Sequence, residues 1–177
     1  MAHGVSSVGF STFELDEVYG VLKAYTTRVG EGPFPTELFG EEADKMRKLG
    51  NEFGATTGRP RRVGWLDLPA MRYAKIRSGL TSIVITKADV LNGYDKIKVC
   101  TSYEVDGEVK DIPSSSADFF KAKPIYEELD GWQNTNEVNF LKYMTYIEEN
   151  TGIKIDYISY GPKTEEMCSK NSLILDM

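Results

Sequence analysis

The arrangement of apolar and polar positions along the chain predicts four helices. In the first and the last of them, apolar side chains recur every three or four positions, the period of one helix face. Alternating charges mark the second, and the third begins at Asp67, an N-cap candidate, and ends at Gly79. The expected helices cover residues 15–25, with Ser11 or Thr12 as N-cap, 41–53, 67–79 and 137–150, which Gly152 follows.

Strand patterns lie between and after these segments. Residues 80–86 (LTSIVIT) form a short run rich in β-branched side chains, as in a strand buried on both faces. Residues 97–105 alternate apolar and polar side chains, which predicts a half-exposed strand, and Asp106-Gly107 is a hairpin turn candidate. Residues 153–159 (IKIDYIS) form another strand, whereas residues 112–124 look irregular. Helices that alternate with strands indicate the α/β class.

Size and composition narrow the picture to one domain that spans residues 1–177, with residues 1–12 and 164–177 left unplaced. The net charge of −6 and the pI near 5.0 argue against a nucleic-acid partner. No apolar run reaches the roughly 20 residues that cross a bilayer, so no membrane association is expected. Two cysteines and one histidine offer no zinc site, and together with the lack of a secretory signal they favour a cytoplasmic location.

The stretch GATTGRPRRVGW, residues 54–65, concentrates positive charge and hydroxyl groups in this acidic protein. Threonine hydroxyls and backbone N–H groups donate hydrogen bonds, and Gly58 permits close approach of a ligand to the main chain. The guanidinium groups of Arg59, Arg61 and Arg62 suit carboxylate or phosphate oxygens. The loop is therefore either a site for a small anion or a solvated basic loop balanced by nearby acids.

Two further candidates each follow a predicted strand, where α/β sheets bind ligands. In Lys87-Ala88-Asp89, the carboxylate could accept both hydrogen bonds from the N1–H and N2–H₂ edge of guanine, and the lysine stem could cover the base. Judged alone, so short a motif is more often structural. Ser159-Tyr160-Gly161-Pro162 is, in isolation, a plain turn.

Four long blocks lie between about Gly20 and Pro162: KAYTTRVGEGPFPTELFGE, LGNEFGATTGRPRRVGWLDLPAMRYA, ITKADVLNGYDKIKVCTSYEVDG and YISYGP. In sequence and in order, these blocks resemble the C-terminal part of adenylosuccinate synthetase. The resemblance implies part of that family's α/β fold, a mixed or parallel sheet flanked by helices. It also implies a ligase of purine nucleotide biosynthesis that joins IMP and L-aspartate with GTP as co-substrate, and a homodimer.

The resemblance further implies roles for individual residues. Thr56, Thr57 and Arg59 would hold the carboxylates of L-aspartate, Arg59 would also reach IMP beside Val29, and Arg61 would contact GTP phosphate. The implied L-aspartate loop is Ala55, Thr56, Thr57, Gly58, Arg59, Pro60 and Arg61, and the implied GTP site is Arg61, Lys87, Ala88, Asp89, Ser159, Tyr160 and Gly161.

The resemblance stops short of the catalytic groups. The family's glycine-rich phosphate loop, its catalytic aspartate, its magnesium ligands and its catalytic histidine have no counterpart here, since His3 stands in another context. Lys163-Thr164 also stands where the family has an acidic residue and then arginine. We therefore expect a fragment of a longer enzyme, inactive alone. The alternatives are a truncated paralogue that binds nucleotides or a partner without catalysis, and a chain completed by a separate N-terminal partner chain.

Overall fold

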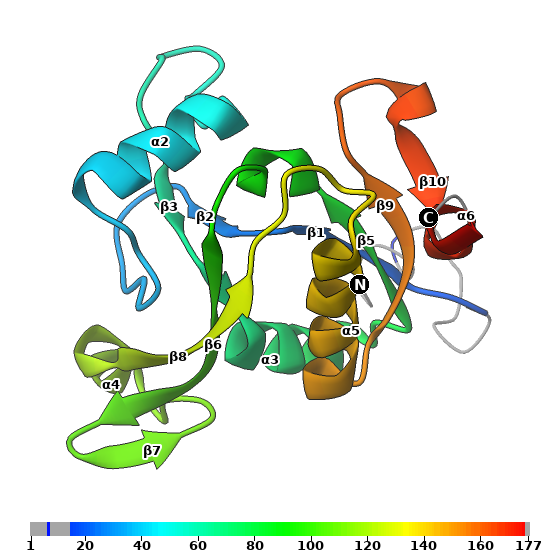
Figure 1. The fold of residues 1–177 in the computed structure, drawn as a ribbon. Coiled ribbons are helices and arrows are strands. Elements are labelled where there is room, and N and C mark those ends of the chain that lie inside the picture. The colour runs from blue at the N-terminus through cyan, green and yellow to red at the C-terminus, as the bar shows by residue number, and fades with distance from the viewer. Residues whose placement is uncertain (1–6, 8–14, 176–177) are drawn as a thin grey trace.

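The computed structural model describes residue 7 and residues 15–175 (Figure 1). Its main sheet has the strand order β1-β5-β9-β10. Strands β1, β5 and β9 are parallel, and β10 is antiparallel to β9. Because β5 lies between two parallel neighbours, its side chains are largely buried, as its β-branched composition predicts. The bounds are β1 Tyr19–Lys23, β5 Ser82–Thr86, β9 Lys154–Ser159 and β10 Met167–Ser169.

Two smaller sheets complete the strand framework. Strand β6 pairs in parallel with β4 and antiparallel with β7 and β8, and β2 pairs antiparallel with β3. Asp106 and Gly107 both have positive φ, 53° and 85°, between β6 and β7, so the predicted hairpin turn is confirmed. The bounds are β2 Thr26–Arg28, β3 Arg62–Gly64, β4 Leu66–Asp67, β6 Lys96–Val105, β7 Glu108–Lys110 and β8 Lys123–Asp130.

Helices surround these sheets, and α5 lies across the front of the main sheet in Figure 1. The predicted caps are confirmed for α3, where the Asp67 carboxylate accepts a hydrogen bond from the Ala70 N–H, and Gly79 and Gly152 end α3 and α5 in left-handed conformations. The bounds are α2 Gly40–Gly50, α3 Leu68–Ser78, α4 Ser116–Lys121, α5 Val138–Thr151, α6 Lys170–Leu175 and the 3₁₀ helices η2 Ala88–Leu91 and η3 Thr164–Glu166. The α/β class is confirmed.

Three local predictions are wrong. Residues 15–25 form no helix: Tyr19–Lys23 is strand β1, because pairing with β5 satisfies its backbone groups within the sheet. The second helix ends at Gly50 and not at residue 53, since Asn51 takes a left-handed conformation, φ 48°. The stretch 112–124 is not wholly irregular, because Ser115 caps α4 by accepting a hydrogen bond from the Asp118 N–H.

The core joins α5 to the main sheet. Trp132 packs against Phe140 and Tyr143, with ring centroids 5.0 and 5.1 Å apart. The Tyr143 hydroxyl donates a hydrogen bond of 2.7 Å to the carbonyl oxygen of Ala24, immediately after β1. Helix α5 is therefore fixed over the carboxyl end of β1, which is also where the polar side chains of the candidate site gather.

The structure describes most of the C-terminal segment but little of the N-terminal one. The N-cap candidates Ser11 and Thr12, and His3, lie outside the described residues. Of the unplaced segment 164–177, residues 164–175 form η3, β10 and α6, and β10 pairs with β9. Among the described residues, no helix is both long and apolar enough to span a membrane.

Replacing Gly131 by alanine tests the packing between the end of β8 and the turn before β6. A Cβ atom there would lie 1.6 Å from the backbone carbonyl oxygen of Tyr94, so the two chain segments would have to separate. We expect Gly131→Ala to lower the free energy of unfolding by about 3 kcal/mol, measured by urea denaturation.

The matched control is Gly107→Ala in the β6–β7 turn, where no atom lies within 4 Å of the new Cβ. Only the positive φ of 85° opposes alanine there, at a cost of about 1 kcal/mol. Equal losses in the two variants would contradict the close contact at Gly131.

Candidate functional site

The carboxyl ends of the three parallel strands carry polar side chains to one edge of the main sheet. Lys23 is the last residue of β1, Lys87 follows β5, and Ser159 is the last residue of β9. Lys23 pairs in register with Thr86, so the two lysines stand at the same level of the sheet. Open α/β sheets bind ligands at this edge.

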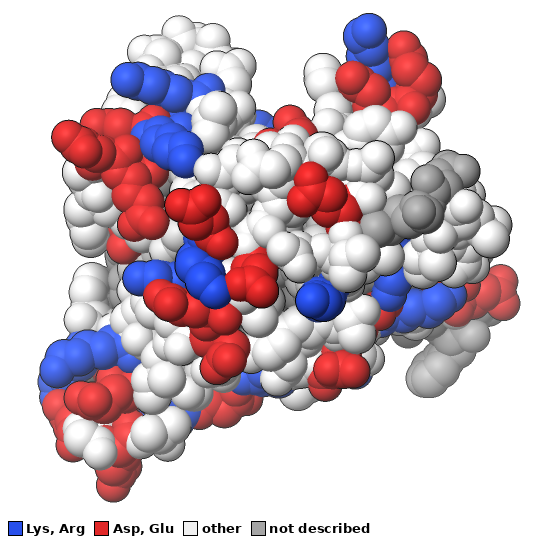
Figure 2. All heavy atoms as spheres, in the orientation of Figure 1, with Lys and Arg blue, Asp and Glu red and all other residues white. Residues whose placement is uncertain are grey.

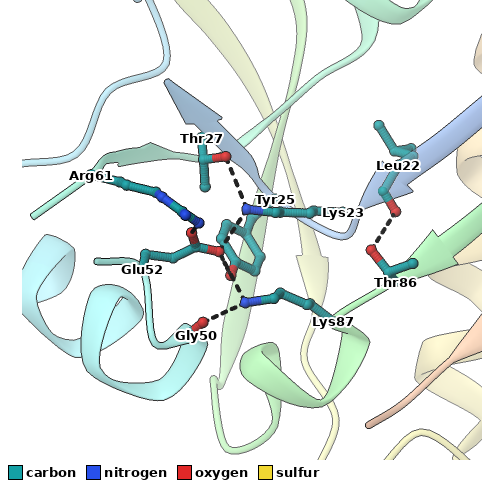
Figure 3. A network of polar contacts seen from close by, with 9 residues as sticks. All are labelled: Leu22, Lys23, Tyr25, Thr27, Gly50, Glu52, Arg61, Thr86 and Lys87. Carbon is teal, nitrogen blue, oxygen red and sulfur yellow. Dashed lines mark hydrogen bonds and ion pairs between the residues drawn. The ribbon is translucent and has the colours of Figure 1, made fainter. Parts of the chain in front are cut away.

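A buried carboxylate, that of Glu52, lies beside the two lysines (Figure 3). Its Oε1 accepts hydrogen bonds from the Lys23 ammonium at 2.7 Å and the Tyr25 hydroxyl at 2.5 Å, and the Lys87 ammonium lies 3.3 Å away. Its Oε2 accepts a hydrogen bond from the Arg61 guanidinium at 2.8 Å. The side chain is 0 % exposed, so one desolvated negative charge is shared by three cations and a phenol.

These partners keep Glu52 ionised. Burial by itself would raise the pKa of this carboxyl, but hydrogen bonds from Lys23, Tyr25 and Arg61 outweigh burial and lower the pKa from 4.5 to about 2. Burial and the neighbouring carboxylate raise the pKa of Tyr25, which therefore stays a hydrogen-bond donor. The cluster holds a fixed charge pattern across the neutral pH range.

A cavity of about 290 Å³ is lined by Arg61, one of the partners of Glu52, and we call it the anion cavity after its arginines and the role proposed for it below. Positive charge dominates its lining, and Arg59 is exposed and forms no ion pair with any described residue. Thr57 and Val29 line it too, so the cavity brings the threonine–arginine stretch to the loop after β2. The lining residues are Arg28, Val29, Gly30, Glu31, Gly54, Thr57, Arg59, Pro60, Arg61 and Arg62.

The three arginines of this stretch, Arg59, Arg61 and Arg62, make different contacts. Arg62 forms a two-pronged ion pair with Glu37 and also donates hydrogen bonds to the carbonyl oxygens of Gly30 and Gly32. Its guanidinium is thus occupied in holding the loop that forms the far wall of the anion cavity. One nitrogen of the Arg61 guanidinium contacts Glu52, and the side chain remains one-third exposed. Of the three arginines, Arg59 is therefore the one whose guanidinium has no carboxylate partner among the described residues.

Backbone hydrogen bonds close the loop between Glu52 and Arg61. The Arg61 N–H donates to the Glu52 carbonyl oxygen at 2.9 Å, and the Gly54 N–H donates to the Arg59 carbonyl oxygen at 2.9 Å. Gly58 has φ 65°, a conformation that favours glycine, and its N–H donates to the Gly54 carbonyl oxygen. The exposed tip, Ala55, Thr56 and Gly58, does not line the anion cavity.

A second cavity, of about 480 Å³, is lined by Lys87, another partner of Glu52, and we call it the nucleobase cavity after the role proposed for it below. It brings Lys87 and Asp89 together with Ser159 and Gly161, as their positions after β5 and β9 suggest. Ala88 is fully buried, and Tyr160 packs on the core with its hydroxyl on the Glu165 carbonyl oxygen, so neither lines the cavity. The lining residues are Leu49, Gly50, Asn51, Thr86, Lys87, Asp89, Val90, Ser159, Gly161 and Pro162.

Lys87 owes its position to a strained backbone. Its φ of 56° is left-handed, which turns the chain out of β5 into η2 and aims the ammonium at the Gly50 carbonyl oxygen and Glu52. The same turn places Asp89 at the mouth of the nucleobase cavity. The two cavities have separate linings, and Glu52 connects Arg61 of one to Lys87 of the other.

Sequence reasoning missed Glu52 and its anchors Lys23, Tyr25 and Thr27. The Lys23 ammonium donates to the Thr27 hydroxyl at 3.0 Å as well as to Glu52. The predicted helix over 15–25 hid Lys23 and Tyr25, and the predicted helix over 41–53 enclosed Glu52. The available signal was a single acid, Glu52, seven positions before Arg59 and the only acidic residue between Asp44 and Asp67.

Charges outside the cluster are mixed. Figure 2 shows lysines and arginines interspersed with acidic side chains over the face in view. Within residue 7 and residues 15–175, no group of three histidine, cysteine, aspartate or glutamate side chains is arranged to hold a metal ion.

Comparison with known proteins identifies relatives of the whole chain. The family model for adenylosuccinate synthetase matches residues 1–168. The adenylosuccinate synthetase of Petrotoga mobilis is 82 % identical over 177 residues, which is 100 % of this chain and 42 % of the relative. That of Thermotoga maritima is 57 % identical over 165 residues, 93 % of this chain and 40 % of the relative. The chain therefore spans about two-fifths of the length of these curated relatives.

A solved structure supports the fold. The fully ligated adenylosuccinate synthetase from Plasmodium falciparum aligns with a TM-score of 0.89 and 35 % sequence identity, over 96 % of this chain and 43 % of that chain. The predicted fold, mixed sheets flanked by helices as in that family, is confirmed.

Acidification tests the Glu52 cluster. Because the pKa of Glu52 is lowered from 4.5 to about 2 in the folded chain, its stabilisation is complete above the unfolded value and is lost as the pH falls from 4.5 towards 2. We expect this group to remove up to about 3 kcal/mol from the free energy of unfolding over that range, measured by urea denaturation at a series of pH values.

Glu52→Gln is expected to be less stable at pH 7 and to lack this part of the acid dependence. Glu149→Gln, the same change at an exposed position of α5, serves as the control and keeps the wild-type slope. If Glu52→Gln and the wild type lose stability in parallel below pH 5, the cluster does not hold an ionised Glu52.

Proposed function

The chain belongs to the adenylosuccinate synthetase family, and from this premise we propose that it forms the aspartate-binding loop and the guanine-binding site of an enzyme that joins IMP and L-aspartate at the expense of GTP. The observation that carries the proposal is the pair of cavities whose cations, Arg61 and Lys87, share Glu52. One presents arginine and threonine side chains, and the other presents a carboxylate beside a lysine.

The anion cavity suits a dicarboxylic amino acid. Thr56, Thr57 and Arg59 hold the carboxylates of L-aspartate, in a loop that runs from Ala55 to Arg61. The exposed position of Thr56 at the tip requires the loop to fold over the bound amino acid, which would also keep water from a phosphorylated intermediate. Arg59 also reaches IMP, and Val29, which is 80 % exposed across the cavity, lies beside the nucleotide.

The nucleobase cavity suits guanine. Asp89 accepts hydrogen bonds from N1–H and N2–H₂ of the base, and the aliphatic stem of Lys87 covers its face. Ser159 and Gly161 supply the opposite wall, Ala88 and Tyr160 support that geometry from behind, and Arg61 reaches toward GTP phosphate. Adenine offers no such pair of donors, so the site discriminates between the two purines.

Proton transfer and Mg²⁺ binding belong, in this proposal, to residues of the family that have no counterpart among these 177. Mg²⁺ would neutralise phosphate charge in the full enzyme, and no step of the chemistry is assigned to the described residues. The residues form the C-terminal portion of the family fold. Exposed apolar side chains such as Ile76, 79 % exposed, and Val21 on the edge strand β1, 77 % exposed, support a homodimer or another covering partner.

Substituting Asp89 tests guanine recognition. Asp89→Asn replaces one acceptor oxygen by an NH₂ donor that would face a donor on the base. We expect GDP to bind the purified chain about 10- to 100-fold more weakly, as the loss of a hydrogen bond to a charged group implies, with dissociation constants measured by calorimetry.

Asp95→Asn, the same change at a nearby exposed residue outside the nucleobase cavity, is the matched control and keeps wild-type affinity. Unchanged GDP affinity in Asp89→Asn would refute the guanine assignment.

Substituting Arg59 tests the anion cavity. Arg59→Met keeps a long side chain and removes the fork that has no internal carboxylate partner, so L-aspartate is expected to bind about 10- to 100-fold more weakly. Calorimetric titration with L-aspartate measures the effect. Arg77→Met, at an exposed position near the end of α3, removes the same charge away from the cavity and should bind L-aspartate like the wild type. Equal affinities for all three proteins would contradict the role of Arg59.

A further inference from the structure

One carboxylate connects the two cavities, and this connection goes beyond the binding roles proposed above. We propose that Glu52 is a positioning residue that couples occupancy of the anion cavity to occupancy of the nucleobase cavity. The coupling acts through Arg61 on one side and Lys87 on the other. This inference rests on the proposed function for the identity of the two ligands, L-aspartate and a guanine nucleotide.

The contacts are divided between the two carboxylate oxygens. Arg61 holds Oε2 at 2.8 Å, and Lys87 lies 3.3 Å from Oε1 (Figure 3). The Glu52 side chain is 0 % exposed, whereas the side chains of Arg61 and Lys87 are 33 % and 37 % exposed. Each cation therefore has one end on the buried carboxylate and keeps surface in its own cavity.

The carboxylate is anchored by groups that belong to neither cavity. Tyr25 is buried and donates to Oε1, and Lys23 donates both to Oε1 and to Thr27. Glu52 therefore stays in place when a ligand engages one of the exposed cations. The main chain tightens the connection, because the Arg61 N–H donates to the Glu52 carbonyl oxygen and the Lys87 ammonium donates to that of Gly50.

Because the Glu52 carboxylate is shielded from water, a change at one of its cations affects the other. A buried carboxylate that loses a donor is left with an uncompensated charge, so the remaining donors are drawn more firmly onto it. A ligand that engages Arg61 weakens the hold of Arg61 on Glu52, so Lys87 is drawn more firmly onto the carboxylate and becomes better ordered. The second ligand then meets a site whose ordering cost has already been met, which produces positive cooperativity without a large structural change.

A merely electrostatic role predicts the opposite result on substitution. Glu52 carries one negative charge against the three positive charges of Lys23, Arg61 and Lys87. Glu52→Gln leaves these cations unneutralised, so each anionic ligand alone would bind more tightly if charge were all that mattered. A purely structural role would lower stability and leave the cooperativity of the folded protein unchanged.

The experiment is a calorimetric titration of the purified chain with GDP, with and without saturating L-aspartate. We expect L-aspartate to strengthen GDP binding about fivefold or more in the wild type, and this ratio to fall to within about twofold of one in Glu52→Gln. The matched control is Glu148→Gln, which removes a half-buried carboxylate that pairs with Lys170 and lines neither cavity. It should keep the wild-type ratio.

A second measurement needs no ligand. Lys87→Met removes the cation on the nucleobase side. Because the remaining donors are then drawn more firmly onto Glu52, we expect slower hydrogen exchange at the Arg61 and Gly54 amides on the anion side. The effect should disappear in the Glu52→Gln background. Lys48→Met, at an exposed position of α2, is the control and leaves these amides unchanged. Should Glu52→Gln not fold, Lys87→Met against Lys48→Met still tests the connection in the native background.

The outcomes separate the two proposals. If both ligands bind but neither the GDP ratio nor the exchange rates respond to Glu52→Gln or Lys87→Met, the coupling is overturned and the proposed function stands. If the exchange coupling is present but neither ligand binds the wild type, the coupling stands and the proposed function falls. Cooperativity that is equally large in the wild type and in Glu52→Gln also overturns the role of Glu52.

Discussion

The burial of one negative charge governs the arrangement of the candidate site. An ionised carboxylate without water costs several kcal/mol unless its oxygens are well paired, and Glu52 meets that condition with four donors from three segments of the chain. Lys23 requires β1 to lie beside β5, and Lys87 requires the chain to turn sharply after β5. Arg61 requires the loop after α2 to return to its starting point. Fold and site are thus held by the same contacts.

Local strain is concentrated around this carboxylate. Asn51 and Lys87 both have positive φ, 48° and 56°, which disfavours side chains with a Cβ atom. Asn51 ends α2 so that Glu52 can enter the cluster, and Lys87 turns its ammonium back toward that helix end. The ion pairs and the Gly50 carbonyl oxygen stabilise these conformations, so the cost of the strained turns is met by the contacts they create.

Sequence reasoning succeeded where local pattern and tertiary structure agree. Strand β5 is predictable because a run of β-branched residues suits a strand with neighbours on both sides, and α3 because Asp67 and Gly79 supply the cap chemistry of its two ends. The segment 15–25 failed because its apolar spacing fits a helix as well as a strand. Only pairing with β5, a partner more than fifty residues away, decides between them. Strand β8 was missed because Pro124 and its many charged residues resemble a loop, and its pairing with β6 decides its conformation.

The site divides in the same way. Asp89, Ser159 and the arginine stretch are candidates from sequence because they follow strands or stand in one continuous motif. Glu52 could not, since a glutamate is ordinarily solvated and its burial depends on partners that the chain brings from β1 and β5. The structure also shows that the three arginines are not equally available to an anion. Arg62 is committed to Glu37 and Arg61 to Glu52, so the excess positive charge offered to an anion is smaller than the sequence suggests and is concentrated at Arg59. Glu37 and Glu52 therefore hold Arg62 and Arg61 in fixed positions and leave the Arg59 guanidinium without an internal carboxylate. This difference among the arginines gives the basic stretch one defined place where an anion can bind.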